Sequence, residues 1–186
     1  RTPKWQSPKA DVRIEAIKNL QPDNADDAAI LLTLARDDND ATVRQQAVST
    51  LNDLDILSQI HKRDADEKVR QAASLRLQAA LTGKTTPALA VQIRLSYLDR
   101  LIGDPLLLNI VQEADDIELR LKAISCITHE ASLAQIVQEI PLARIRQAAA
   151  EGIKNEALLE SLVKLMQAKD KNTYRTLKTR LDALTD

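Results

Sequence analysis

Residues 40–51 read DATVRQQAVSTL, and this stretch contains a phrase that returns along the whole chain. An apolar lead, Val43, is followed at once by Arg44. A small residue, Ala47, stands four places after the lead and an aliphatic residue, Leu51, stands eight places after it. Residues spaced by four and eight lie on one side of an α-helix, so the phrase predicts a short amphipathic helix.

Four further copies fit the same frame. They are Val12, Arg13, Ala16 and Leu20; Val69, Arg70, Ala73 and Leu77; Leu119, Arg120, Ala123 and Ile127; and Ile145, Arg146, Ala149 and Ile153. A looser copy starts at Ile93 and a degenerate one at Tyr174, so that successive leads are 31, 26, 24, 26, 26 and 29 residues apart. Self-similarity at a period of this length indicates a repeat architecture.

Helix start and stop signals between the copies add a second set of helices, and together they predict twelve helices and no strand. The expected ranges are about 7–20, 25–36, 40–51, 54–62, 66–81, 86–102, 105–114, 116–128, 131–139, 141–152, 156–168 and 171–184. Asp40 and Asp66 are the expected N-caps of two phrase helices. Thr86 and Pro87 open one longer helix that carries the looser phrase in its middle, so the repeat is irregular at 82–103. The fold class is all-α: a right-handed α-solenoid of short helical hairpins, forming one domain over residues 1–186.

The repeated arginine points into the apolar side of its helix. At about 100° per residue, the buried arc of the phrase centres near 65° and the arginine lies near 100°. An unpaired charge there is costly, so the guanidinium should reach a carboxylate or a helix-end carbonyl. The natural partners are acidic residues just before the phrases, Asp11, Asp40, Asp66 and Asp116. The expected structural ladder is Arg13, Arg44, Arg70, Arg120 and Arg146 with Asp40 and Asp66. An anion-binding ridge is the alternative.

The alanine four places after the lead is expected where two helices cross closely. A methyl group leaves room for the neighbouring helix, whereas a larger side chain would force the two apart. Tyr97 takes this place in the looser copy, which agrees with a wider or differently angled crossing there.

Composition limits the class of protein. The 26 basic and 27 acidic side chains give a net charge of −1, which provides no overall attraction for nucleic acid or a membrane surface. Cys126 is the single cysteine, no apolar run approaches the roughly 20 residues of a membrane span, and residues 1–186 contain no signal-peptide pattern. We therefore expect a cytoplasmic protein without membrane insertion. Because the sequence begins at Arg1 without methionine, we also expect a piece of a longer chain.

Several resemblances to chemical motifs fail on inspection. Gly83, Lys84 and Thr85 imitate the end of a phosphate-binding loop, but that motif needs a glycine where Gln78 stands and a preceding strand. Cys126 and His129 are three residues apart, yet no further cysteine completes a typical zinc set. No grouping of serine, histidine and acid stands out. We expect no catalysis, no cofactor and no metal.

Paired short helices with an Asp-x-x-Val-Arg-x-x-Ala-x-x-x-Leu pattern, as at residues 40–51, resemble HEAT and HEAT-like repeats, including the short variety of phycobilisome-lyase relatives. The resemblance implies that the Asp and Arg are structural and that the second helix of each pair lines a concave side. The opening from Pro3 to Gln6, leading into Val12 and Arg13, is similar to the start of large uncharacterised bacterial proteins that place such repeats before a long helical region.

The solvent side of the phrase helices is the expected partner-binding face. It lies two, three and six places after each lead, and its candidate residues are Gln45, Gln46, Ser49, Gln71, Leu75, Leu121, Lys122, Gln147 and Glu151. This face is almost neutral, whereas phosphate binding rests on clustered Lys and Arg. We expect a protein–protein interaction scaffold whose protein partner the sequence does not identify. A nucleic-acid-binding HEAT-like solenoid, similar to glycosylases that grip DNA, is the alternative.

Overall fold

The computed structural model describes all 186 residues, Arg1–Asp186, and its regular structure is entirely helical. Twelve α-helices and no strand are present, which confirms the all-α prediction and the number of helices. The helices are α1 (Ala10–Ile17), α2 (Ala25–Asp37), α3 (Ala41–Val48), α4 (Leu54–Arg63), α5 (Glu67–Thr82), α6 (Val91–Leu98), α7 (Leu106–Glu113), α8 (Ile117–Cys126), α9 (Glu130–Glu139), α10 (Ala143–Glu151), α11 (Glu156–Met166) and α12 (Lys171–Thr185). Short 3-10 segments, η1 and η2, cover Lys4–Gln6 and Asp99–Leu101. No helix combines the length and the apolar character that crossing a bilayer requires.

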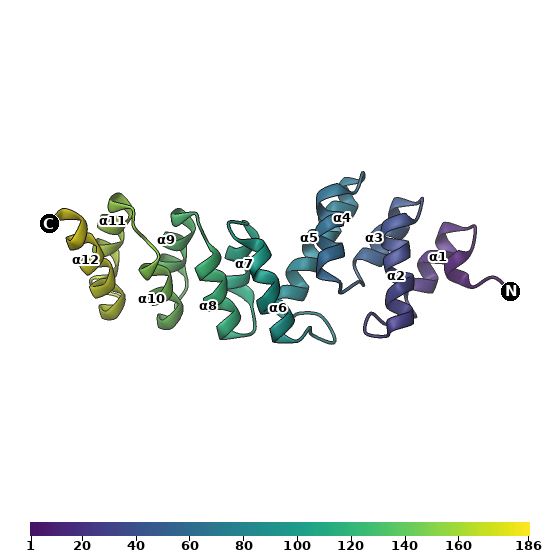
Figure 1. The fold of residues 1–186 in the computed structure, drawn as a ribbon, viewed down its shortest axis with the longest axis horizontal. Coiled ribbons are helices and arrows are strands. Elements are labelled where there is room, and N and C mark those ends of the chain that lie inside the picture. The colour runs from purple at the N-terminus through teal and green to yellow at the C-terminus, as the bar shows by residue number, and fades with distance from the viewer. The chain divides into compact units, whose positions relative to one another are not determined.

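The chain divides into two compact units (Figure 1). The N-terminal unit, Arg1–Leu89, contains α1 to α5, and the C-terminal unit, Ala90–Asp186, contains α6 to α12. The boundary lies inside the stretch 82–103, where the sequence predicts an irregular repeat.

Within each unit, the phrase helices pack on one another and the remaining helices pack beside them. In the N-terminal unit α3 packs against α1 and α5, while α2 covers α3 and α4 covers α5. In the C-terminal unit α6, α8, α10 and α12 pack in succession, and α7, α9 and α11 form hairpins with α8, α10 and α12. Each unit therefore has two rows of helices. We call the helices that carry the phrase the phrase row, and the helices packed beside them the second row.

The phrase supplies the buried side of its own row. The leads Val43, Val69, Leu119 and Ile145 are fully buried. The alanines four places after these leads, Ala47, Ala73, Ala123 and Ala149, are also fully buried. Since each alanine lies on the side that faces the neighbouring helices, its small size sets how closely the helices approach.

Short polar side chains start most of the helices. Asp40, Asp66, Asp116 and Asp170 each accept the backbone N–H of the residue three places later. Asn24, Asp53 and Asn155 do the same for helices of the second row. These caps satisfy N–H groups that lack a partner in the first turn, and they fix where each helix begins.

The prediction of one long helix over 86–102 is wrong. The segment before Val91 is not helical, and α6 is a helix of 8 residues followed by η2. The buried Thr85 hydroxyl donates a hydrogen bond of 3.0 Å to the carbonyl of Pro87, which holds this segment as a turn. Proline also disfavours helical backbone in the residue before it, so Thr86 does not extend a helix backwards.

In the looser and the degenerate phrase copies, the buried positions are shifted by one residue relative to the expected lead. Ile93, the expected lead of the looser copy, is 53% exposed, and the buried residues of α6 are Arg94, Tyr97 and Leu98. In α12 the fully buried positions are Thr173 and Leu177, and Thr173 lies one place before the expected lead Tyr174. The cap at Asp170 lies three places before Thr173, as the cap does in the clear copies, so the phase of α12 starts at Thr173.

The close helix contact at the alanines gives a stability prediction. Replacing Ala47 or Ala123 with leucine should lower the free energy of unfolding by roughly 1 to 3 kcal/mol, because the added carbons have no space in a packed core. Urea midpoints would measure the loss. Ala157→Leu, at an exposed position of α11, is the matched control and should change little. Equal midpoints for all three variants would contradict a close contact at Ala47 and Ala123.

Candidate binding site

The first two ladder arginines join one repeat to the next. Arg13 holds Asp38 with two hydrogen bonds, Nε to Oδ2 at 2.8 Å and Nη2 to Oδ1 at 2.9 Å. Arg44 holds Asp64 in the same way, at 3.1 and 3.2 Å. Asp38 is 4% exposed and Asp64 is 8% exposed, so these pairs are largely shielded from water. The hydrogen bond to Asp38 raises the pKa of Arg13.

Each of these guanidinium groups also contacts its own repeat. Nη1 of Arg13 donates to the carbonyl of Ser7 at 2.8 Å, and Nη1 of Arg44 donates to the carbonyl of Asp38 at 2.9 Å. In both cases the carbonyl lies six residues before the arginine. One side chain therefore fixes the turn before its own helix and the turn before the next phrase helix.

Arg70 has only the first kind of contact. Its Nη1 donates to the carbonyls of Asp64, at 2.7 Å, and Ala65, at 3.1 Å. Asp38 and Asp64 lie five places before their leads, and the corresponding place before Ile93 is Ala88, which has no carboxylate. The forward link is therefore absent from Arg70.

The C-terminal unit repeats the ladder with more variation. Arg94 donates to Asp115 at 2.8 Å and Arg146 donates to Asp170 at 2.9 Å. Arg120 instead donates from Nε to the carbonyl of Val111 at 2.6 Å. These contacts again give the buried guanidinium groups an oxygen partner, either a carboxylate or a carbonyl.

The carboxylates that the sequence suggested as ladder partners make other contacts. Asp40, Asp66 and Asp116 accept helix N–H groups as N-caps, and Asp11 accepts the N–H of Val12. The ladder partners are Asp38, Asp64, Asp115 and Asp170 instead. Asp40, Asp66 and Asp116 are held by the first turns of their own helices, so the Asp one or two places earlier takes the arginine. Asp170 does both, since its Oδ1 caps α12 while its Oδ2 accepts from Arg146.

A sequence signal for the correct partners exists. Residues 38–44 and 64–70 both read Asp-x-Asp-x-x-Val-Arg. The first Asp of each motif accepts the arginine of the preceding phrase and the N–H of the second Asp, which caps the helix. The spacing therefore assigns a separate role to each acidic residue.

A second set of cations, which the sequence reasoning missed, reaches back toward the preceding phrase helix. Arg76 donates to the carbonyls of Leu51 and Thr50, Lys122 to the carbonyl of Leu95, and Arg180 to the carbonyl of Ile153. The distances from Arg76 are 2.9 and 3.0 Å, and those from Lys122 and Arg180 are 2.8 and 2.7 Å. Carbonyls near the end of a helix lack helical partners and carry partial negative charge, so they attract these cations.

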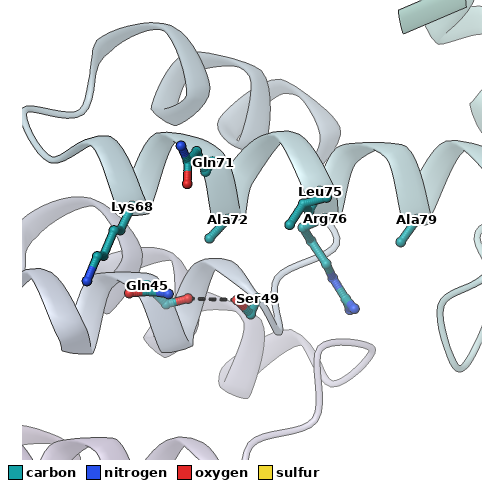
Figure 2. A pocket seen from close by; sticks show the side chains of 8 residues that line it. All are labelled: Gln45, Ser49, Lys68, Gln71, Ala72, Leu75, Arg76 and Ala79. Carbon is teal, nitrogen blue, oxygen red and sulfur yellow. Dashed lines mark hydrogen bonds between the residues drawn. The ribbon is translucent and has the colours of Figure 1, made fainter. Parts of the chain in front are cut away.

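Four predicted face residues line one groove between α3 and α5. Gln45 and Ser49 come from α3, and Gln71 and Leu75 come from α5. The groove has a volume of about 610 Å³, and its other lining residues are Lys68, Ala72, Arg76 and Ala79 (Figure 2). Leu75 is 67% exposed, so it presents most of an aliphatic side chain to the groove. We call this surface the α3–α5 groove.

The other predicted face residues have different surroundings. Gln46 is exposed on α3 but does not line the groove, and Glu151 is exposed at the end of α10. Leu121 is half-buried on α8. Lys122 pairs with Asp99 at 3.2 Å in addition to its carbonyl contact, and Gln147 donates to Thr176 and Glu151. Lys122 and Gln147 are therefore held mainly by contacts inside the C-terminal unit.

Reactive side chains gather at a second hollow in the C-terminal unit. Asp104, His129 and Ser132 line a pocket of about 340 Å³. The Asp104 carboxylate accepts the N–H of Leu106, and no hydrogen bond joins the three side chains to one another. A nucleophile and its base need such a bond, so this pocket gives no support for acyl-transfer chemistry. No group of three potential metal ligands is present in the chain.

A carboxylate of α9 fixes the turn between α10 and α11. Oε1 of Glu130 accepts the backbone N–H of Lys154 at 2.6 Å and that of Asn155 at 2.9 Å. These hydrogen bonds hold the pKa of Glu130 below its ordinary value of 4.5. Because the charged form is favoured in the folded protein, the bonds stabilise the fold wherever Glu130 is ionised.

No family model, curated protein or solved structure matches this chain. The resemblance to HEAT-like repeats therefore rests on the sequence pattern alone.

The two acidic residues of the motif at 38–44 should respond differently to the same substitution. Asp38→Asn removes the charge that holds Arg13 and should lower the free energy of unfolding by roughly 1 to 3 kcal/mol. Asp40→Asn should cost less than about 0.5 kcal/mol, since Asn is an equally good N-cap. Urea titration would measure both. In the background of Arg13→Met, the cost of Asp38→Asn should shrink. A larger cost for Asp40→Asn would restore the partner suggested by the sequence.

Glu130 gives a pH prediction with a defined sign. Its folded pKa is lowered, so its contribution to stability is complete above the unfolded value of 4.5 and disappears as the pH falls through the folded value. Wild type should exceed Glu130→Gln in urea midpoint at pH 7, and the gap should close at pH 3. Glu118→Gln is the control, because Glu118 makes only an exposed contact with Arg144 at 3.3 Å. A gap that is constant between pH 7 and pH 3 would refute the account.

Proposed function

We propose that this chain is a non-catalytic protein-binding scaffold, and that each unit is a stretch of right-handed α-solenoid made of HEAT-like repeats. The succession of phrase helices in a row, each with a helix beside it, supports the solenoid. The ladder arginines support it too, since a contact from one repeat to the next is what a stack of small units requires. An experimental structure of the full chain in which the hairpins turn left-handed would contradict this architecture.

The observation that carries the binding function is the α3–α5 groove with Leu75 in it. An aliphatic side chain that is 67% exposed in a polar-edged hollow has surface to bury against a partner. Ala79 is half-buried and adds a small apolar patch to the lining, which lets a partner approach the helix backbone. Such a surface fits a protein segment better than a reaction, because the groove contains no acid, histidine or cysteine to transfer protons or attack a substrate.

The ladder argues against the anion-ridge alternative. The guanidinium groups of Arg13, Arg44 and Arg146 are held by carboxylates within the fold. Non-specific binding to nucleic acid rests on many unpaired Lys and Arg contacts to phosphates, on the order of 6 to 10 in well-studied cases. The groove supplies two cations, Lys68 and Arg76. The proposal therefore favours a protein partner.

Leu75 provides the test of this function. Leu75→Asp should remove protein partners that the wild-type chain captures from a lysate of the source cells, because it places a charge where apolar contact is needed. Mass spectrometry of the captured proteins would measure the loss. Ile102→Asp is the matched control, since Ile102 is 65% exposed and lies in the other unit. Identical sets of captured proteins for the wild type and for Leu75→Asp would sink the assignment of this groove.

A further inference from the structure

The α3–α5 groove contains positive charge and no negative charge. Two of its eight lining residues, Lys68 and Arg76, are cations, and none is Asp or Glu. The chain as a whole has 27 acidic side chains against 26 basic ones, so an acid-free lining is a local property. Glu67 is the nearest acidic residue along α5, and its contact is with Gln71 at 3.4 Å.

Arg76 differs from Arg13, Arg44 and Arg146 in its partners, and like Arg70 and Arg120 it has only neutral acceptors. Its Nε and Nη2 donate to two carbonyls, and Nη2 also donates to the side-chain oxygen of Asn52 at 2.7 Å. All three acceptors are neutral, whereas Arg13 and Arg44 each hold a carboxylate. Burial lowers the pKa of Arg76, because no nearby carboxylate offsets the lost hydration. Its Nη1 remains available to a further acceptor.

Lys68 is the second cation of the groove that has no carboxylate partner. It is exposed, and its ammonium group makes no ion pair or hydrogen bond within the chain. Figure 2 shows Lys68 and Arg76 extending from α5 to the same side, on which Gln45 and Ser49 of α3 lie. Lys68 and Arg76 are eight positions apart in α5, which is about 12 Å along the helix axis. Ala72 lies midway and Leu75 lies beside Arg76.

We propose that the α3–α5 groove binds an extended acidic segment of a partner protein, with one carboxylate at Lys68, one at Arg76 and an aliphatic side chain between them. This inference rests on the proposed protein-binding function and specifies the chemistry of the partner. In an extended chain, alternate residues share a side and four residues span about 13 Å. An acidic residue, a spacer, a leucine, a spacer and a second acidic residue therefore match the two cations and the apolar lining. The carboxylate at Arg76 supplies the counter-charge that the fold does not.

Nucleic acid has the negative charge that the two cations require, but its bases do not suit the aliphatic lining of the groove. Single strands bind through stacking of bases on aromatic side chains, and the groove has none. Leu75 and Ala79 instead present aliphatic surface, which suits an aliphatic side chain of a peptide.

The test uses the full 186-residue chain and a fluorescent peptide with the core Glu-Ala-Leu-Ala-Glu, measured by fluorescence anisotropy. Peptides with Gln-Ala-Leu-Ala-Gln and Glu-Ala-Ser-Ala-Glu cores are controls for charge and for apolar contact. The acidic peptide with leucine should bind most tightly, and its affinity should fall with salt. Equal affinity for the acidic and the Gln peptides would overturn the proposal.

Variants locate the binding. Lys68→Gln should weaken binding of the acidic peptide about threefold, as expected for an exposed ion pair. Arg76→Gln should weaken it about tenfold or more, because a partly buried charge-assisted bond is stronger. Arg76→Lys keeps a charge and should bind better than Arg76→Gln, which separates loss of charge from loss of folding. Lys62→Gln, an exposed lysine of α4 outside the groove, is the control and should bind like wild type.

A charge exchange gives the sharpest outcome. Lys68→Glu should lose the acidic peptide and gain affinity for a peptide whose first Glu is replaced by Lys. Equal loss for Lys68→Gln and Lys62→Gln would overturn the proposal. The proposal would also be overturned, in favour of nucleic acid, if a 12-nucleotide single strand bound more tightly than the acidic peptide and lost that binding in Arg76→Gln.

Failure of this inference is distinguishable from failure of the scaffold function. Captured proteins that depend on Leu75 but not on Lys68 or Arg76 would preserve the scaffold and overturn the acidic-segment proposal. Binding of the acidic peptide in the groove, without any Leu75-dependent protein among those captured, would support the acidic-segment proposal and remove the scaffold function.

Discussion

The buried side of the phrase helices α1, α3, α5, α6, α8 and α10 contains an arginine, and its charge must be matched. A guanidinium group at the edge of a core loses most of its hydration, which costs several kcal/mol unless oxygen acceptors replace the water. Arg13 and Arg44 obtain those acceptors partly from their own repeat and partly from the turn that starts the next phrase helix. The packing of one repeat therefore depends on the presence of the next, which turns a set of marginal helix pairs into a cooperative unit.

The same requirement explains why Arg70 is different. No carboxylate precedes α6 at the position where Asp38 and Asp64 precede their helices, and the residues between α5 and α6 form a turn instead of a second-row helix. Arg70 is satisfied by the carbonyls of Asp64 and Ala65, both within the N-terminal unit. The loss of the forward link and the division of the chain at Leu89 thus occur in the same interval.

Periodicity was sufficient to predict the helices, because apolar spacing and N-cap residues are local signals. It failed at Thr86 and Pro87, where a proline that opens many helices instead lies in a turn held by Thr85. Partner choice was less predictable. Asp40 stands four residues before Arg44, but the N–H groups of its own helix take its carboxylate, and Arg44 pairs instead with Asp64, the first Asp of the next Asp-x-Asp motif.

The groove was predicted in part for a similar reason. Positions two, three and six places after the lead identified Gln45, Ser49, Gln71 and Leu75, because they lie opposite the buried arc. Lys68, one place before its lead, lies on the same solvent side and was open to the same reasoning. Arg76, seven places after the lead, lies at the edge of the buried arc, where a structural role is the natural expectation. Arg76 does make structural hydrogen bonds, but every acceptor that the fold gives it is neutral, so no carboxylate balances its charge. Arg70 and Arg120 also have only carbonyl partners, but neither lines the α3–α5 groove, so Arg76 is the arginine that brings a positive charge without a carboxylate partner to this surface.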